Sequence, residues 1–388
     1  MTEQREQEDQ ACSCPAEQSD IKRYFAQASQ ARIPLAACFE LTRRCTFRCV
    51  HCYLGDQKEI HRHRYRELDT EKVLALFDEM VDAGTLFLHL TGGDPMLRPD
   101  FLGIYQQAVR RGLLVTVFCN GTLITDEIIR TFVKYPPRVV EITLYGATAP
   151  TFEAITQKKG SFAACMKGIE RLRQAKVRLR LKTMVMTLNV DEFSAMRQLA
   201  EDMGLQFRHD CSLHGALPND DNGGKSNTGR SLHDPLQYRL PPEQAAAVDM
   251  SVDEVAVKLI EQAQSAPLKK RPNKLYQCSA GKSAFHVTPY GRLQPCLMIV
   301  QTYGLTLGRN GIQAGWNGRL KQFTKCTATS SFPCNSCPDR GRICTICPGI
   351  FSLASGNPEE VDSFYCQYAE HRDKEIKKIQ KGVSNECK

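Results

Sequence analysis

The sequence predicts an α/β fold in which a parallel β-sheet is followed by a cysteine-rich region. Short apolar runs alternate six times with segments of helical periodicity between residues 35 and 212. The connections are short, and successive strand–helix–strand units give parallel pairing through right-handed crossovers. From Leu275 onward the chain becomes rich in turns and cysteine. Periodicity alone leaves open whether the sheet is open or curled into a barrel.

Each expected element rests on a local pattern. The segment Glu71–Ala83 repeats apolar residues at helical spacing, whereas Leu86–Leu90 is a short apolar run typical of a buried strand. The segment Ala284–Cys296 reads as a hairpin around a central glycine. The expected strands are Ala36–Leu41, Leu86–Leu90, Leu113–Phe118, Val139–Leu144, Val177–Met186 and one that begins at Gln206–Arg208. The expected helices are Glu71–Ala83, Phe101–Arg110, Asp126–Lys134, Phe162–Gln174, Glu192–Met203, Gln244–Ala263 and a charged terminal helix, His371–Gln380.

These patterns divide the chain into five segments. We expect an N-terminal extension (1–32), a core (33–212), a polar loop with a linking helix (213–272), a cysteine-rich domain (273–370) and a charged C-terminal tail (371–388). The polar loop is rich in Asn, Asp and Gly and predicts either a substrate lid or a linker. The extension is too short to form a separate peptide-recognition domain.

Composition narrows the class of protein. The chain has 388 residues, 18 cysteines and a net charge of +8. It contains no apolar run of about 18 residues, so no membrane span is expected. Its polar start does not resemble a signal peptide, which favours the cytoplasm. In that compartment, clustered cysteines bind metal more often than they form disulfides. Basic residues form no dense block, so we expect no nucleic-acid partner.

The most informative motif is a loop with three closely spaced cysteines. Cys45, Cys49 and Cys52 follow the first expected strand and supply three thiolates, and no fourth cysteine follows nearby. A structural 4Fe–4S cluster normally takes four cysteines, so three ligands leave one iron open to a substrate or cofactor. Zinc is the alternative occupant, although zinc motifs usually close with four ligands.

This spacing resembles the signature of the radical SAM enzymes. In that family the open iron is chelated by S-adenosylmethionine, whose cleavage gives a 5′-deoxyadenosyl radical. The resemblance implies a partial (β/α)6 TIM-like barrel with its chemistry at the C-terminal ends of the strands. It extends to Gly92-Gly93-Asp94-Pro95, which is similar to the family's Gly-Gly-Glu-Pro motif, with Asp in place of Glu. The implied contacts with S-adenosylmethionine are His51, Gly92, Gly93, Asp94, Pro95, Asn120, Thr143 and Lys182.

The cysteines of the last third resemble a SPASM domain, which carries auxiliary iron–sulfur clusters. The clustered cysteines are separated by two, six and two residues, whereas the family usually has two, five and three. A zinc ribbon is the alternative for this group taken alone. The resemblance implies one 4Fe–4S cluster on Cys334, Cys337, Cys344 and Cys366, and a second on Cys278, Cys296 and Cys347. The second would have an open iron or a fourth ligand such as Cys326.

The resemblance implies that the chain modifies a ribosomally synthesised precursor peptide, by a crosslink or another oxidative change. It also implies an electron donor such as flavodoxin or ferredoxin, and leader binding by the barrel, the polar loop or a separate protein. Alternatives are formylglycine formation, disfavoured because Leu297 replaces an acidic residue, epimerisation with Cys119 or Cys211 as hydrogen donor, and decarboxylation of a cofactor precursor. A non-enzymatic iron–sulfur electron carrier is the competing class. No acid or base is assigned, and His209 and Asp210 are only suspects at a strand end.

Overall fold

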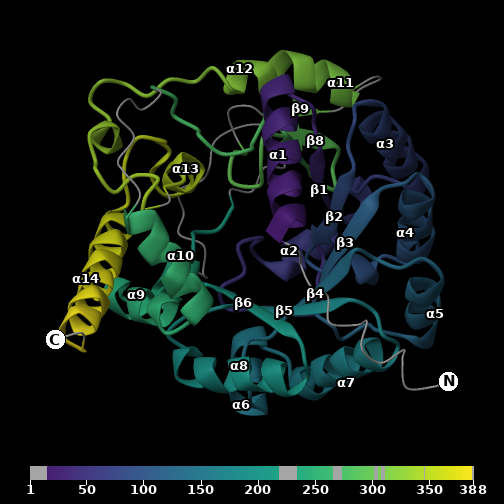
Figure 1. Cartoon of the computed structure of the whole chain (residues 1–388). Helices are drawn as coiled ribbons and strands as arrows, with labels where there is room; N and C mark the ends of the chain where they lie inside the picture. The colour runs from purple at the N-terminus through teal and green to yellow at the C-terminus, as the bar shows by residue number, and fades with distance from the viewer. Residues whose placement is uncertain are drawn as a thin grey trace.

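The structure is a computed structural model that describes residues 15–217, 234–264, 273–300, 305–306, 311–344 and 346–386. Its centre is a curled sheet whose first six strands lie side by side in chain order (Figure 1). All pairs among these six are parallel. The strands are β1 (Ala36–Thr42), β2 (Phe87–Gly92), β3 (Leu114–Cys119), β4 (Val139–Thr143), β5 (Leu179–Met184) and β6 (Gln206–Asp210). The predicted parallel α/β sheet is confirmed, and so is its curling into a partial barrel.

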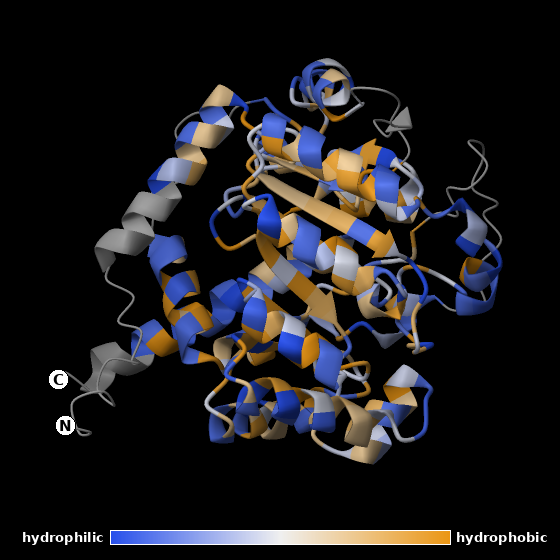
Figure 2. Cartoon of the chain, turned by 90° about the vertical axis from the view of Figure 1, so that its right-hand side faces the viewer, coloured by the Kyte–Doolittle hydropathy of each residue, from blue (hydrophilic) through white to orange (hydrophobic). Residues whose placement is uncertain are grey.

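The helices cover the outer face of this sheet, whose strands are largely hydrophobic (orange in Figure 2). Buried apolar side chains of strands and helices form one cluster. Phe39 of β1, for example, packs edge-to-face against Phe77, with ring centres 5.8 Å apart. Opposite residues such as Cys38 and Glu40 therefore face the barrel lumen, because side chains alternate along a strand. The covering helices are α3 (Thr70–Asp82), α4 (Phe101–Arg110), α5 (Asp126–Lys134), α6 (Ala149–Thr156), α7 (Ser161–Gln174) and α8 (Phe193–Asp202). A short helix, α2 (Gln57–Arg62), follows the cysteine loop.

The N-terminal segment is helical from Pro15 to Ala31 (α1), which the sequence analysis left as an extension. Its end is tied to the C-terminal region, since Arg32 donates hydrogen bonds to the backbone oxygens of Gly281 (3.0 Å) and Trp316 (2.9 Å). The indole N–H of Trp316 donates in return to the Arg32 oxygen at 2.7 Å. Two segments distant in sequence are therefore joined beside the barrel.

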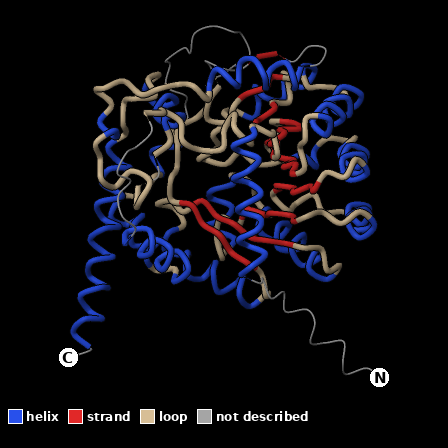
Figure 3. Tube along the Cα trace, turned by 45° about the horizontal axis from the view of Figure 1, so that its top comes forward, coloured by secondary structure: helices blue, strands red, loops and turns tan. Residues whose placement is uncertain are grey.

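The cysteine-rich region begins by extending the barrel sheet. Strand β7 (Ala284–Val287) pairs in parallel with β1, and β8 (Arg292–Gln294) and β9 (Leu305–Thr306) continue antiparallel. The predicted hairpin is thus present, but its pairing with β1 was not foreseen. Between this hairpin and α14 the described chain is mostly loop (Figure 3). The helices there are α11 (Gly311–Gly315), α12 (Lys321–Phe323), α13 (Pro348–Ser355) and α14 (Ser363–Glu386).

Two expected elements differ from the structure. The single helix Gln244–Ala263 is wrong: α9 (Pro242–Met250) and α10 (Asp253–Gln264) are separate. The break lies at Ser251, whose hydroxyl donates back to the Val248 oxygen at 2.7 Å, and the acidic start of α10 favours a new helix N-terminus. Helix α14 begins well before His371 and packs against α9, so its described part is not a separate solvated tail.

Other features fall outside what the structure describes. Of the polar loop, residues 218–233 lie outside the described residues, so the lid and linker readings both stay predictions. Across the described chain, no helix is both long and apolar enough to span a bilayer.

Candidate functional site

The cysteine loop leaves β1 at the C-terminal end of the sheet, where the end of β2 holds it by backbone contact. The N–H groups of Gly93 and Asp94 donate to the carbonyl oxygens of Thr42 and Arg44, each at 2.9 Å. A Cβ atom on Gly92, which has φ +133°, would lie 1.8 Å from the Thr42 oxygen. One on Gly93 would lie 2.4 Å from the Arg44 oxygen. Only glycine allows this approach, so the Gly-Gly pair fixes the start of the cysteine loop.

The three thiols of the loop lie together and are sheltered from water. Burial raises the pKa of Cys45 to about 12, and the nearby Asp94 carboxylate adds to this. Burial also raises the pKa of Cys49, followed by the charges of Cys52 and Cys45. A multinuclear cation would therefore have to supply the charge that makes these sulfurs thiolates.

The spacing of these sulfurs argues against one zinc ion. Two thiolates bound to the same zinc lie within about 4.6 Å of each other, because each Zn–S bond is about 2.3 Å. Within the described chain, the one set of three potential ligands whose atoms all lie within 4.8 Å is His209, Cys211 and Asp249. The three loop sulfurs do not all lie within 4.8 Å of one another, so they do not form a closed site for one zinc ion.

Two amide side chains orient the loop. Gln57 of α2 accepts a hydrogen bond from the Cys45 N–H (2.8 Å) and donates to the Arg43 oxygen (3.2 Å). Asn120 donates to the Cys45 sulfur at 3.7 Å and to Thr46 Oγ1 at 2.9 Å. Asn120 is among the predicted cofactor contacts, whereas Gln57 was not predicted, because no motif marks a glutamine five residues after Cys52.

Asp94 joins two strand ends. One carboxylate oxygen accepts from the Met96 N–H at 2.9 Å and the other from the Asn120 N–H at 3.2 Å. Complete burial raises its pKa to about 6, although these hydrogen bonds act in the opposite direction. The short side chain therefore reaches from the end of β2 to the end of β3. The predicted contacts of Gly92, Gly93, Asp94 and Pro95 with S-adenosylmethionine stay predictions.

The remaining predicted contacts lie at neighbouring strand ends. His51 is buried edge-to-face against Tyr145 at 4.8 Å, and burial lowers its pKa to about 4. Thr143 and Lys182 are register partners on β4 and β5. The Lys182 ammonium lies 3.6 Å from Glu141 Oε2 and 3.6 Å from the centre of the Phe118 ring. Their cofactor contacts also stay predictions.

The C-terminal cysteines fall into two spatial groups. Burial raises the pKa of Cys344 to about 12, and the next contributions come from Cys337, Cys366 and Cys334. Burial likewise raises the pKa of Cys296 to about 12, with further contributions from Cys347 and Cys278.

These groups are the two sets that the SPASM resemblance implied. None of them forms a set converging within 4.8 Å in the described chain, which again suits clusters better than single zinc ions. Ligation itself, and the role of Cys326, stay predictions.

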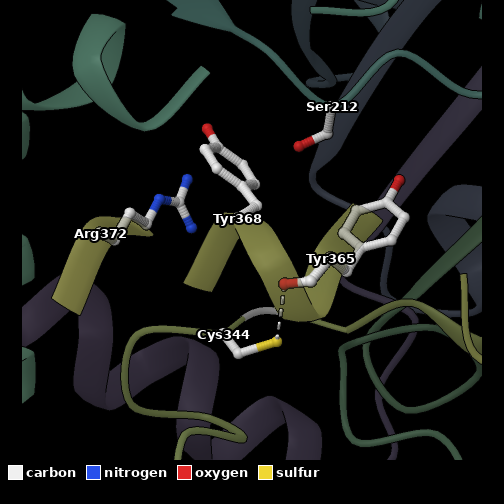
Figure 4. A pocket seen from close by; sticks show the side chains of 5 residues that line it. All are labelled: Ser212, Cys344, Tyr365, Tyr368 and Arg372. Atoms are coloured by element: carbon white, nitrogen blue, oxygen red, sulfur yellow. Dashed lines mark hydrogen bonds between the residues drawn. The ribbon is translucent and has the colours of Figure 1, made fainter. Parts of the chain in front are cut away.

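A cavity of about 210 Å³ lies beside Cys344 of the first of these groups (Figure 4). Its lining residues come from the segment after β6, from the cysteine region and from α14: Ser212, Cys344, Tyr365, Tyr368 and Arg372.

Beside this cavity, Asp249 of α9 joins barrel and C-terminal helix. It accepts from Tyr368 (2.6 Å) and Arg372 (2.8 Å) of α14 and pairs with His209 of β6 (2.9 Å). Because Arg372 already neutralises Asp249, we interpret the His209–Cys211–Asp249 group as a joint between domains rather than a cation site.

Thiols outside the clusters have contrasting positions. Cys119 lies on the helix-facing side of β3, and Cys211 directly follows β6. Both are buried in the apolar core, so the structure does not place them in the lumen. Cys38 instead lies on the lumen face of β1, opposite His286 of β7. Burial lowers the pKa of His286, but the neighbouring Cys38 and Glu40, whose carboxylate lies 3.5 Å from His286 Nε2, outweigh it and raise the pKa to about 9.

The fold and these motifs agree with comparisons to known proteins. The model of the radical SAM superfamily matches residues 39–202. The AdoMet-dependent heme synthase of Methanosarcina barkeri is 31% identical over 176 residues, which cover 45% of this chain and 50% of that protein. The antilisterial bacteriocin subtilosin biosynthesis protein AlbA of Bacillus subtilis is 26% identical over 276 residues, covering 70% of this chain and 57% of that protein. The chain thus spans about half the length of these curated relatives.

A solved structure extends the likeness to the C-terminal region. SuiB of Streptococcus suis, in a crystal structure bound to its precursor peptide SuiA, has a TM-score of 0.63. The match covers 92% of this chain and 82% of SuiB at 13% identity, so it concerns the fold alone. Residues 39–202 therefore carry a radical SAM domain, and the cysteine-rich region after it, with its two cysteine groups, resembles a SPASM domain.

Proposed function

We propose that this chain is a radical SAM enzyme that modifies a ribosomally synthesised peptide. Cys45, Cys49 and Cys52 would hold a 4Fe–4S cluster with one open iron. When bound, this cluster and S-adenosylmethionine together supply a 5′-deoxyadenosyl radical, which removes an unactivated hydrogen atom from a substrate carbon. The C-terminal cysteine groups would hold two auxiliary clusters, which would accept one electron from the substrate radical as it is converted to the oxidised product.

The chain's own residues give this site its shape. Gly92 and Gly93 hold the cysteine loop against the end of β2. Asn120 and Tyr145 direct hydrogen bonds at the sulfurs of Cys45 and Cys49, which stabilises their thiolate forms. Such bonds to ligand sulfurs tune the potential of an iron–sulfur cluster.

The extent of the likeness to relatives carries the choice of a peptide substrate. The heme synthase matches 45% of the chain, whereas AlbA, a bacteriocin biosynthesis protein, matches 70%. The fold likeness to SuiB covers nearly the whole chain, and SuiB binds a precursor peptide. A crosslink or another oxidative change is the outcome that a pair of auxiliary clusters favours.

The structure weakens two alternatives. Leu297, at the position where formylglycine-forming relatives carry an acidic residue, packs in an apolar cluster with Leu54, Leu217 and Val300. Epimerisation through Cys119 or Cys211 loses support because both thiols are buried away from the lumen. We further propose a flavodoxin or ferredoxin as electron donor, and leader binding by the barrel rim or a separate protein.

The proposal is tested with protein purified without oxygen, whose clusters have been reconstituted. Dithionite and S-adenosylmethionine should give 5′-deoxyadenosine, and Cys45→Ala should give none. Adding the product of a short open reading frame next to the gene should give a peptide of altered mass. Wild-type protein that forms no more 5′-deoxyadenosine than Cys45→Ala would instead support the electron carrier, and turnover of a porphyrin but no peptide would support the small-molecule alternative.

A further inference from the structure

One wall of the barrel lumen carries more positive than negative charge. Glu141 of β4 lies 3.1 Å from Arg180, 2.8 Å from Arg208 and 3.6 Å from Lys182, measured between carboxylate oxygens and side-chain nitrogens. We call Arg180, Lys182 and Arg208 the lumen cation cluster. Because one buried carboxylate neutralises one cation, two positive charges remain.

Strand register places this cluster inside the barrel. Arg180 is the register partner of Glu141, and Lys182 that of Arg208, so all four side chains lie on one face of β4, β5 and β6. His209, next to Arg208, points the other way and contacts Asp249 of α9. The face of Arg208 is therefore the lumen face.

The pKa of the neighbouring His89 is lowered in the direction that an excess of positive charge in the lumen would cause. Burial lowers the pKa of His89, and Arg138, Lys182 and Arg208 lower it further, outweighing the opposite effect of Glu141. Asp210 follows Arg208 on the same face of β6, but its carboxylate accepts a hydrogen bond from the Ser212 N–H and lies near Tyr365. It therefore faces the C-terminal region.

The cluster can be reached from the open side of the barrel. Strand β6 pairs with β5, and no described strand pairs with its other edge. The Arg208 side chain is 55% exposed, whereas Arg180 and Lys182 are each 27% exposed and Glu141 is 4% exposed. A ligand entering past β6 would meet Arg208 first and the deeper cations next.

We propose that the lumen cation cluster binds a carboxylate of the peptide substrate, which makes peptides with acidic residues the preferred substrates. This inference rests on the proposed function and adds a substrate class to it. A half-enclosed cleft lined by one sign of charge concentrates ligands of the opposite sign. Charged groups paired there contribute more than pairs on an open surface. The other source of a carboxylate is S-adenosylmethionine itself, since Lys182 is among its predicted contacts.

The test uses the reconstituted full chain and a terminally blocked hexaglutamate peptide, with hexaglutamine as the uncharged counterpart. Calorimetry at low salt should show tighter binding of hexaglutamate to the wild type. Arg208→Gln should weaken hexaglutamate binding about 10-fold, corresponding to about 1.4 kcal/mol. Arg208→Lys should keep most of the affinity. Arg130→Gln removes the same charge from exposed Arg130 on α5 and should have no such effect.

Each outcome separates the two carboxylate sources. Loss of hexaglutamate affinity in Arg208→Gln, with unchanged affinity for S-adenosylmethionine, supports the inference. Equal losses in Arg208→Gln and Arg130→Gln, or a loss confined to S-adenosylmethionine, would overturn it. If 5′-deoxyadenosine still forms in those cases, the proposed function stands without the acidic preference; if the wild type forms none, the proposed function fails instead.

Discussion

The two cysteine regions of this chain are built on opposite plans. Cys45, Cys49 and Cys52 lie in one short loop that Gly93, Asp94, Gln57 and Asn120 hold through backbone and amide hydrogen bonds. The C-terminal cysteines are spread over 278–366, in chain that is mostly loop and carries a much smaller apolar cluster than the barrel. The barrel therefore preorganises the first site, whereas we expect the second region to depend on bound clusters for more of its stability than the barrel does.

The largest effect should follow from adding one methyl group between the barrel and the first loop. In Gly93→Ala the new Cβ would meet the carbonyl oxygens of Arg43 and Arg44 at 2.5 and 2.4 Å, and backbone cannot move aside cheaply. We expect loss of the first cluster from iron analysis and a fall in 5′-deoxyadenosine formation of at least ~10–100-fold. Gly103→Ala on α4, which meets nothing within 4 Å, is the matched control. Normal iron content in Gly93→Ala would show that the loop is not held as described.

The next largest effect should follow from removal of iron, which should destabilise the second region more than the barrel. Hydrogen exchange after chelation should accelerate at least ~10-fold in the described parts of 273–366, since metal binding there contributes folding free energy. Strands β2, β3 and β4 should keep most of their protection because their core is apolar. Equal acceleration in both regions would contradict the contrast between them.

Asp249 should matter because it joins the two regions. Asp249→Ala leaves Arg372 buried without its carboxylate, and breaking such a pair costs about 3 kcal/mol. We expect a lower Tm and faster exchange in α9 and α14. Glu261→Ala, on the exposed side of α10, should change neither. An Asp249→Ala protein as stable as the wild type would show that Asp249 does not stabilise the contact between the barrel and α14.

The smallest effect concerns the seam between β1 and β7. The pKa of His286 is raised from 6.5 to about 9, so its contribution to stability is complete below pH 6.5 and is lost as pH rises through about 9. Burial would raise the pKa of Glu40, but Arg43 and His286 lower it from 4.5 to about 2, so its contribution is present above pH 4.5 and is lost as pH falls toward 2.

Unfolding of the wild type should therefore become easier by about 1–3 kcal/mol between pH 7 and 9. In His286→Gln the free energy of unfolding should not change with pH over this range. His89→Gln should keep the slope, because the pKa of His89 is lowered rather than raised. A wild-type protein without the alkaline loss would show that the His286–Glu40 pair does not stabilise the seam.

The barrel strands and helices could be predicted from the sequence because each is set by its own local pattern of apolar and polar residues. Apolar runs bounded by helices located all six strands within a few residues, and cysteine spacing predicted which thiols lie near one another. What could not be predicted depends on contacts between distant segments: the pairing of β7 with β1, and the hold of Arg32 on Gly281. The role of Gln57 could not be predicted because its hydrogen-bond partners are backbone atoms, which every residue has and no sequence motif marks.

The most direct test of the central claim is electron paramagnetic resonance of the dithionite-reduced protein, recorded with and without S-adenosylmethionine. To isolate the first cluster, Cys334, Cys337 and Cys344 are changed to alanine together with Cys278, Cys296 and Cys347. We predict a 4Fe–4S signal that shifts when S-adenosylmethionine is added and vanishes in Cys45→Ala. A signal that does not respond to S-adenosylmethionine, or mononuclear zinc in place of iron, would contradict an open iron held by Cys45, Cys49 and Cys52.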